Sequence, residues 1–140
     1  MFKRDLVEQL KKRMKEERLF MQIVIGPRQT GKTTAVLQAL EAASKPYHFI
    51  SADDPVVVSP EWLRNEWEKA RLMQKQTRKE IILAIDEVQK VPQWSSMVKF
   101  LWDEDTRKKT PVKVILSGSS SLLIQKGLNE SMAGRFEVLF

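Results

Sequence analysis

One stretch of nine residues constrains the fold of this chain more than any other. "GPRQTGKTT", residues 26–34, follows the apolar run "MQIVI" and precedes "AVLQALEAA". The apolar run has the length of a buried strand, and the following run is rich in helix-forming residues. Glycine and proline between them predict a tight loop that joins a strand to a helix. The stretch also matches the pattern G-x-x-x-x-G-K-[ST], with Gly26, Gly31, Lys32 and Thr33 at its fixed positions.

Such a loop is suited to binding phosphate. The first turn of a helix presents unpaired backbone N–H groups, and the helix dipole adds about half a positive charge there. We therefore predict that Lys32 reaches the β and γ phosphates of a nucleotide and that the Thr33 hydroxyl holds Mg²⁺. An ordinary turn before a capped helix is the plainer interpretation, which the flanking strand and helix disfavour. The predicted nucleotide-binding residues are Gly26, Pro27, Arg28, Gln29, Thr30, Gly31, Lys32, Thr33 and Thr34.

Short apolar runs alternate with helical patterns along the rest of the chain. This alternation predicts a mostly parallel sheet covered by helices on both faces. The predicted strands are Met21 to Ile25, Tyr47 to Ser51, Ile81 to Ile85, Val112 to Ser117 and Phe136 to Phe140. Helical patterns cover an amphipathic segment within residues 1–19, residues 33–43, a segment that begins at the capping residue Ser59, and a segment after Pro92.

Two acidic residues end the third predicted strand. In "IILAIDE", Asp86 and Glu87 follow five apolar residues, at the point where a parallel strand leaves the core. We predict that Asp86 binds Mg²⁺ and that Glu87 orients or deprotonates the attacking water. A surface pair that closes a strand is the structural alternative. A rival acidic pair, Asp53 and Asp54, follows a shorter and less apolar strand, so we interpret it as turn and cap residues near the site.

Further candidate residues lie near the C-terminus. The fourth strand ends in "VILSGSSS", where Ser117 and Ser119 are candidates to sense the γ phosphate, although Ser119 or Ser120 could equally cap a helix. Arg135 is a candidate arginine finger, acting within its own chain or on a partner, and a surface ion pair is its alternative. Arg28 is a further candidate for contact with phosphate or with Glu87.

Composition limits the remaining possibilities. With 140 residues and 42% hydrophobic content, we expect a single domain. The net charge of +6 suits an anionic partner, and DNA contacts through a basic surface stay open although no base-reading motif is present. The chain has no cysteine, which excludes thiolate metal sites, and its one histidine, His48, argues against a histidine-built metal site. Its apolar runs are too short to span a bilayer, and we expect a cytoplasmic protein. The tryptophans have core-like spacing.

Taken together, these motifs resemble a known family. "GPRQTGKTT", "SADDP", "IILAIDEVQKVPQW", "VILSGSSSLL" and "AGRFE", in this order, resemble the AAA-like ATPase domain of a large group of bacterial and archaeal proteins, from about Phe20 to Phe140. The resemblance implies a three-layer α/β/α P-loop NTPase fold with strand order 5-1-4-3-2, and ATP or ADP with Mg²⁺ as ligands. Members of the family normally continue beyond the fifth strand, so we expect a fragment or an isolated core.

The resemblance also implies roles for single residues. It assigns Lys32 and Thr33 to the Walker A motif, Asp86 and Glu87 to the Walker B motif, Ser117 or Ser119 to the sensor region, and Arg135 to a Gly-Arg element. We expect an ATPase that works as a conformational switch, is slow alone, and takes an arginine from a protein partner or a second copy. The alternative function is a nucleotide-independent interaction or nucleic-acid-binding module on the same fold.

Overall fold

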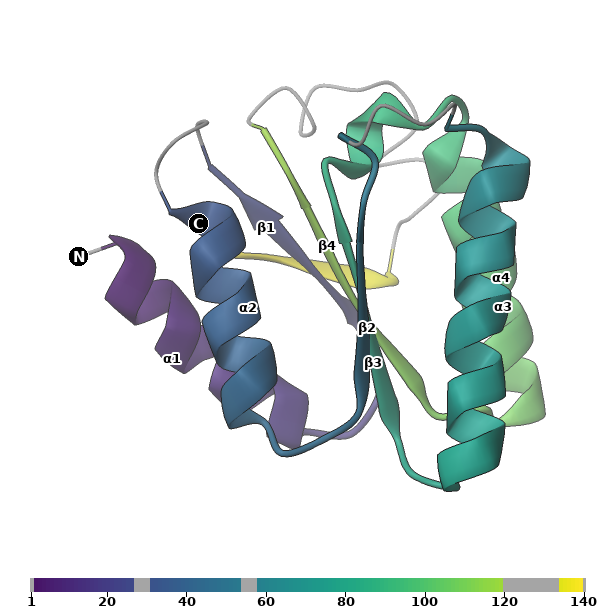
Figure 1. The fold of residues 1–140 in the computed structure, drawn as a ribbon, viewed down its shortest axis with the longest axis horizontal. Coiled ribbons are helices and arrows are strands. Elements are labelled where there is room, and N and C mark those ends of the chain that lie inside the picture. Colours follow the sequence, from purple (N-terminus) through teal and green to yellow (C-terminus); the bar gives the residue numbers. More distant parts are fainter. Residues whose placement is uncertain (1, 27–30, 54–57, 120–133, 140) are drawn as a thin grey trace.

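The computed structural model describes residues 2–26, 31–53, 58–119 and 134–139. Its centre is a five-stranded sheet in the order β2-β3-β4-β1-β5, and all neighbouring strands are parallel (Figure 1). This is the order 5-1-4-3-2 read from the other edge, so the predicted fold is confirmed. The strands are β1 (Met21–Ile25), β2 (Tyr47–Ser51), β3 (Ile81–Asp86), β4 (Val112–Gly118) and β5 (Phe136–Leu139).

Helices cover both faces of the sheet, which gives three layers. In Figure 1, α1 and α2 lie on one side, and α3 and α4 lie on the other. The inner strands β1, β3 and β4 are mostly apolar because successive side chains point to opposite faces and both faces are buried, whereas the outer strands β2 and β5 are only partly buried. In β3, for example, Ile82 packs with the α1 and α2 residues, whereas Leu83 packs with those of α3 and α4. The helices are α1 (Phe2–Lys15), α2 (Lys32–Ala42), α3 (Pro60–Thr77) and α4 (Trp94–Lys108), with a short 3-10 helix η1 (Val88–Lys90).

The helix signals in the sequence correspond to observed caps and buried faces. Ser59 caps α3, because its hydroxyl accepts a hydrogen bond from the Trp62 amide at 3.1 Å, and Pro60 is the first helical residue. The amphipathic helix α1 buries Leu6, Leu10 and Met14 next to residues of α2. None of the helices in the described part of the chain is both long and apolar enough to cross a membrane.

The tryptophans pack in the core, as predicted. Trp67, Trp94 and Trp102 are buried, and Trp62 packs against the same cluster of residues. The indole Nε1 of Trp67 donates a hydrogen bond to Asp105 Oδ2 at 2.8 Å, so this large side chain is buried with its polar atom satisfied. These contacts account for the tryptophans by packing and leave base stacking without support.

A single arginine fastens the segment between α1 and β1 to the rest of the domain. Arg18 donates hydrogen bonds to the carbonyls of Val112 and Trp102 and to the Thr106 hydroxyl, and its guanidinium lies 3.6 Å from the centre of the Trp102 ring. Burial lowers the pKa of Arg18. The planar guanidinium suits this combination of stacking and several hydrogen bonds better than an ammonium group would.

Candidate functional site

The phosphate-loop motif lies where β1 meets α2. Gly31 caps α2 with a φ angle of 83°, in the left-handed region where glycine has no steric penalty. Lys32 and Thr33 then form the first turn of the helix. At the other end of the motif, the Gly26 amide donates to the Gly118 carbonyl at 3.4 Å, which joins the ends of β1 and β4. Pro27, Arg28, Gln29 and Thr30 lie outside the described residues.

The predicted metal ligands lie side by side at this edge of the sheet. Thr33 Oγ1 donates a hydrogen bond to Asp86 Oδ2 at 2.8 Å, and Ser117 Oγ donates to Asp86 Oδ1 at 2.7 Å. The sheet register explains this arrangement, because Asp86 and Ser117 are paired positions of the neighbouring strands β3 and β4. Asp86 is buried, so both of its carboxylate oxygens have hydrogen-bond donors within the protein.

This donor set fits a magnesium ion that is shared with a ligand. Mg²⁺ prefers oxygen ligands and is usually held by one or two protein groups together with phosphates and water. The Asp86 carboxylate and the Thr33 hydroxyl provide such oxygens within hydrogen-bonding distance of each other. Among the described residues, no group of three or more His, Cys, Asp or Glu side chains can hold a metal on its own.

The predicted base forms a buried ion pair with the phosphate-loop lysine. Lys32 Nζ lies 3.1 Å from Glu87 Oε1, and the two side chains are only 5% and 8% exposed. Glu87 has a φ angle of 54°, a left-handed conformation that costs a residue with a side chain free energy. Backbone strain at a buried acid that faces a lysine is typical of functional sites.

A residue that the sequence analysis overlooked completes this arrangement. Gln89 Nε2 donates a hydrogen bond to Glu87 Oε2 at 2.6 Å, so Lys32 and Gln89 hold the two oxygens of one carboxylate. Chemistry fixes the orientation of the Gln89 amide, since its oxygen would repel a carboxylate at that distance. The sequence "DEVQ" places a glutamine two residues after Glu87. Its side chain contacts Glu87 only because the chain turns sharply in η1.

Comparisons with known proteins agree with this geometry. A family model described as an AAA domain matches residues 18–140. The chain belongs to the AAA domain family. The resemblance inferred from the motifs is thereby confirmed. Among curated protein sequences, none matches the chain.

Solved structures of several AAA-like chains share the fold of this domain. Cdc6p from Pyrobaculum aerophilum matches with a TM-score of 0.66 at 10% identity, over 96% of this chain and 43% of its own. A chain of the HORMA:CdnC:Trip13 complex of E. coli MS115-1 matches with a TM-score of 0.66 at 14% identity, over 88% and 44%. RuvB T158V from Thermotoga maritima matches with a TM-score of 0.59 at 20% identity, over 98% and 42%. This AAA domain thus spans less than half the length of those chains.

The structure does not bring Arg135 to the phosphate loop of its own chain. Its carbonyl accepts a hydrogen bond from the Met21 amide, which places it where β1 begins, whereas the phosphate loop starts where β1 ends. The five residues of β1 separate the beginning of the strand from its end, a distance of roughly 16 Å. The Arg135 guanidinium binds both carboxylate oxygens of Asp103, at 2.8 and 3.0 Å, and this hydrogen bonding raises the pKa of Arg135. The surface ion pair, its alternative, is therefore the arrangement found, and action on a partner stays a prediction.

The other sequence candidates have simpler placements. Ser117 joins the site through Asp86, and Ser119 follows β4 at the same edge of the sheet. The helix that Ser119 or Ser120 was proposed to cap falls outside the described residues. Asp53 lies in the turn after β2, where its amide donates to Ser51 Oγ and its carboxylate pairs with Lys90, and Asp54 is not described.

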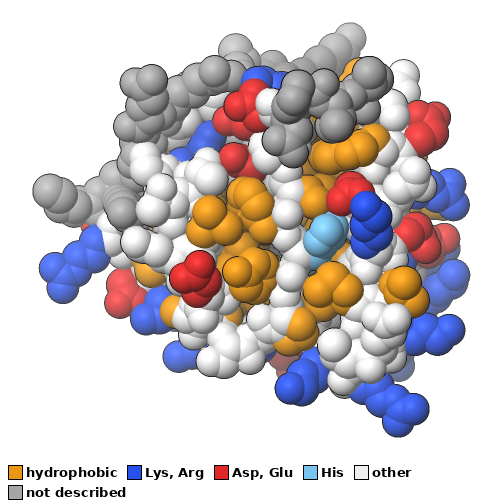
Figure 2. All heavy atoms as spheres, in the orientation of Figure 1, with side chains coloured by type: hydrophobic (Ala, Val, Ile, Leu, Met, Phe, Trp, Pro, Cys, Tyr) orange, Lys and Arg blue, Asp and Glu red, His pale blue; other side chains and the backbone are white. Residues whose placement is uncertain are grey.

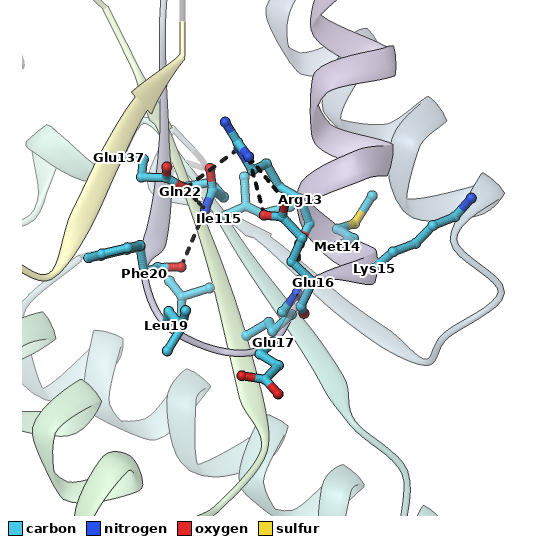
Figure 3. A pocket seen from close by; sticks show the side chains of 12 residues that line it. Arg13, Met14, Lys15, Glu16, Glu17, Leu19, Phe20, Gln22, Ile115 and Glu137 are labelled. Carbon is cyan, nitrogen blue, oxygen red and sulfur yellow. Dashed lines mark hydrogen bonds and ion pairs between the residues drawn. The ribbon is translucent and has the colours of Figure 1, made fainter.

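A hollow of about 520 Å³ lies at the opposite end of the sheet, between the end of α1 and the beginnings of the strands (Figure 3). Its walls include apolar side chains such as Leu19, Phe20 and Ile115, and its polar groups already bind one another. Gln22 Nε2 donates to Glu137 Oε1 at 3.0 Å, and Lys113 Nζ donates to the carbonyls of Arg13, at 2.7 Å, and Glu16. Lys113 thus satisfies carbonyls near the end of α1. The hollow contains none of the predicted site residues and is separate from the candidate site.

Proposed function

We propose that this AAA domain binds ATP with Mg²⁺ and hydrolyses it to ADP and phosphate. The observation that supports the proposal best is the convergence of Lys32, Thr33, Asp86 and Glu87 at one edge of the sheet. These residues come from two segments more than fifty positions apart, and they meet through hydrogen bonds of 2.8 and 3.1 Å. A surface pair that merely closes a strand would have no reason to be buried against the lysine and threonine of a phosphate-loop motif.

Each residue has a chemical role in this reaction. The Lys32 ammonium and the amides at the start of α2 bind the β and γ phosphates. Asp86 and Thr33 would hold Mg²⁺, which when bound offsets negative charge on the phosphate oxygens. Glu87 accepts a proton from water as the water oxygen bonds to the γ phosphorus and the bond to the ADP oxygen breaks. The proton then passes to the departing phosphate.

The Lys32–Glu87 ion pair gives the site two arrangements. Without nucleotide, the lysine neutralises the buried glutamate. A bound triphosphate competes for the same ammonium group, and when it gains Lys32 the contact between Lys32 and Glu87 is lost. Nucleotide binding and release of the base are then one event, which is the kind of local exchange that can drive a conformational switch.

Gln89 is the group that keeps Glu87 in place after this exchange. It lies in η1 between Val88 and Val91, which are both buried in the core. The Val91 amide donates to the Val88 carbonyl at 3.0 Å, so the turn that carries Gln89 is fixed on both sides. We infer that Gln89 is a positioning residue for the base.

A titration separates this proposal from a nucleotide-independent module. We expect labelled ATP with Mg²⁺ to bind saturably to the wild-type chain and not to Lys32→Ala, with slow release of phosphate by the wild type alone. Absence of saturable binding to the wild type would reject the proposal.

The proposed switch leaves a place for an arginine from another molecule. Arg135 lies at the far edge of its own sheet and Arg28 lies outside the described residues, so we propose that a second copy or another protein supplies an arginine for the transition state. Specific activity that rises with protein concentration would support a second copy as the source. Activity that is independent of concentration, with no oligomer formed in the presence of ATP, would argue against it.

A further inference from the structure

The edge of the sheet opposite the phosphate loop carries a concentrated positive charge. Helices α3 and α4 both end there, and the register that pairs Ile81 with Val112 sets the two following turns side by side. Figure 2 shows Lys and Arg side chains along the lower rim of the molecule, below the ends of these helices in Figure 1. We call this set of exposed residues the basic end: Lys75, Arg78, Lys79, Arg107, Lys108 and Lys109.

Its charge is large on the scale of the chain. The six residues of the basic end carry as much positive charge as the whole chain has in excess, +6, so the rest of the chain is neutral on balance. The nearby acids form ion pairs with other cations, because Glu80 pairs with Lys45, and Glu104 and Asp105 pair with Arg71. Glu104 also attracts Arg107 and Lys108 of the basic end and so offsets part of their charge. The helix dipole favours cations in the last turn of a helix, but its effect fades within that turn, and Lys79 lies beyond it.

Two of these cations occupy positions that favour glycine. Arg78 and Lys109 are the capping residues at the ends of α3 and α4, with φ angles of 58° and 56°. A left-handed conformation is costly for any residue with a side chain, and helices usually end there with glycine or asparagine. Both helices therefore keep a basic residue where glycine or asparagine would be less strained. Two neighbouring residues that are both strained and both positively charged are a reason to look for a ligand.

The chemistry of the surface indicates which ligand. The exposed large apolar side chains in the described part of the chain are Leu19, Phe20, Leu72 and Phe100, and none lies in the basic end. The centre of a protein interface is usually apolar. The neighbours of the cations are instead Gln76 and Thr77, which are the kinds of residue that contact phosphate and sugar alongside lysine and arginine. We propose that the basic end binds the phosphate backbone of DNA without reading its sequence.

Replacing the two strained cations by glycine tests the proposal directly. In Arg78→Gly/Lys109→Gly, the backbone strain is relieved while two charges are lost. We expect binding of a labelled 20-base-pair duplex to weaken by at least about tenfold at low salt, and the slope of log K against log salt to fall by about 2. The unfolding temperature should be no lower than that of the wild type, which a merely structural role for these residues would not allow.

A matched control separates charge from backbone. Ser44 also has a left-handed φ angle, 56°, and follows α2 without a charge. Ser44→Gly relieves the same kind of strain, and we expect it to leave DNA binding unchanged. If the double variant is too unstable to compare, Lys75→Glu/Lys79→Glu, which alters no left-handed residue, takes its place with the same expected loss. Unchanged binding in that variant, or in a well-folded double glycine variant, would overturn the proposal.

Two further measurements place the binding surface and the class of ligand. Lys32→Ala lies at the other edge of the sheet and should bind DNA as the wild type does, so loss of DNA binding there would assign the duplex to the phosphate loop instead. A poly-glutamate peptide of equal charge should compete at least about tenfold less well than DNA, because closely spaced phosphates release more condensed counterions. Equal competition would show a general acid-binding surface and reject DNA as the ligand.

Discussion

The Lys32–Glu87 ion pair allows a quantitative prediction for Glu87→Gln. At 3.1 Å and an effective dielectric constant of 20, the Coulomb attraction is about 5 kcal/mol before desolvation, which sets an upper limit. Glutamine keeps one oxygen that can accept from Lys32, and its NH2 group then faces Gln89, which can turn its amide to accept with its own oxygen. The main loss is then the charged character of the Lys32 hydrogen bond. Charged and neutral hydrogen bonds differ by about 1.4 kcal/mol, and we expect the free protein to lose roughly that much stability. For a domain of this size, this is a fall of roughly 5 °C in unfolding temperature.

The same substitution should strengthen ATP binding by an equal amount. With triphosphate bound, Lys32 pairs with phosphate in both proteins, so the loss in the free variant returns as a gain of about 1.4 kcal/mol, or tenfold, in affinity. Phosphate release should fall by about 10²- to 10⁴-fold, because the general base is gone. Thermal unfolding with and without Mg²⁺ and ATP, together with a phosphate-release assay, measures all three quantities.

A surface variant provides the control for this experiment. Glu8→Gln removes an exposed partner of Lys11, whose nitrogen lies 3.6 Å away, and should change neither stability nor affinity measurably. The reasoning fails if Glu87→Gln leaves the free protein as stable as the wild type with unchanged ATP affinity, since the buried pair would then not exist in solution. Undiminished phosphate release would separately remove Glu87 from the role of base.

Three further predictions concern single contacts. Gln89→Met should lower kcat by at least about tenfold with little change in ATP affinity. Gln76→Met, on an exposed site of α3, should change neither quantity. A matching loss of ATP affinity in Gln89→Met would point to a merely structural role. Thr33→Val should weaken ATP binding in the presence of Mg²⁺ but not in its absence, and Thr33→Ser should restore it; equal losses with and without the metal would remove Thr33 from the metal site. Trp67→Phe leaves a buried oxygen of Asp105 without its indole donor and should lower the free energy of unfolding in urea by about 1–3 kcal/mol, so an unchanged midpoint would contradict the contact.

The sequence predicts the sheet well because the inner strands are buried on both faces. A run such as Ile81 to Ile85 has no stable alternative to a central strand, and the short connections restrict how the strands can be ordered. The phosphate loop is equally determined, since its glycine at position 31 has the left-handed angle that the pattern requires. Ser59 and Pro60 mark the beginning of α3 for similarly local reasons.

The position of Arg135 and the contact of Gln89 were left open or missed in the sequence for two different reasons. Arg135 immediately precedes β5, and in a parallel sheet a residue before a strand lies at the edge away from residues that follow strands. Chain order together with parallel pairing was therefore enough to place it away from the phosphate loop of its own chain. Gln89 is different, because its contact depends on the left-handed angle of Glu87 and on the tight turn after it. No periodicity in the sequence signals such an angle at a residue with a side chain.

The common direction of the parallel strands also explains where the two proposed ligand sites lie. In a parallel sheet with returning helices, all strand ends and helix N-termini meet at one edge, so backbone N–H groups gather there and suit a nucleotide bound by side chains such as Lys32. The helix C-termini gather at the other edge, where their carbonyls favour cations such as Lys108. Strand polarity therefore gives one small domain two separate surfaces that suit anionic ligands. The strands β3 and β4 run from the proposed nucleotide site to the basic end, so they could carry a movement that follows the exchange of Lys32 from Glu87 to phosphate. If that path operates, ATP should change the affinity for DNA in the wild type and leave it unaltered in Lys32→Ala, whose basic end is intact; an identical response of both proteins would show that the two surfaces work independently.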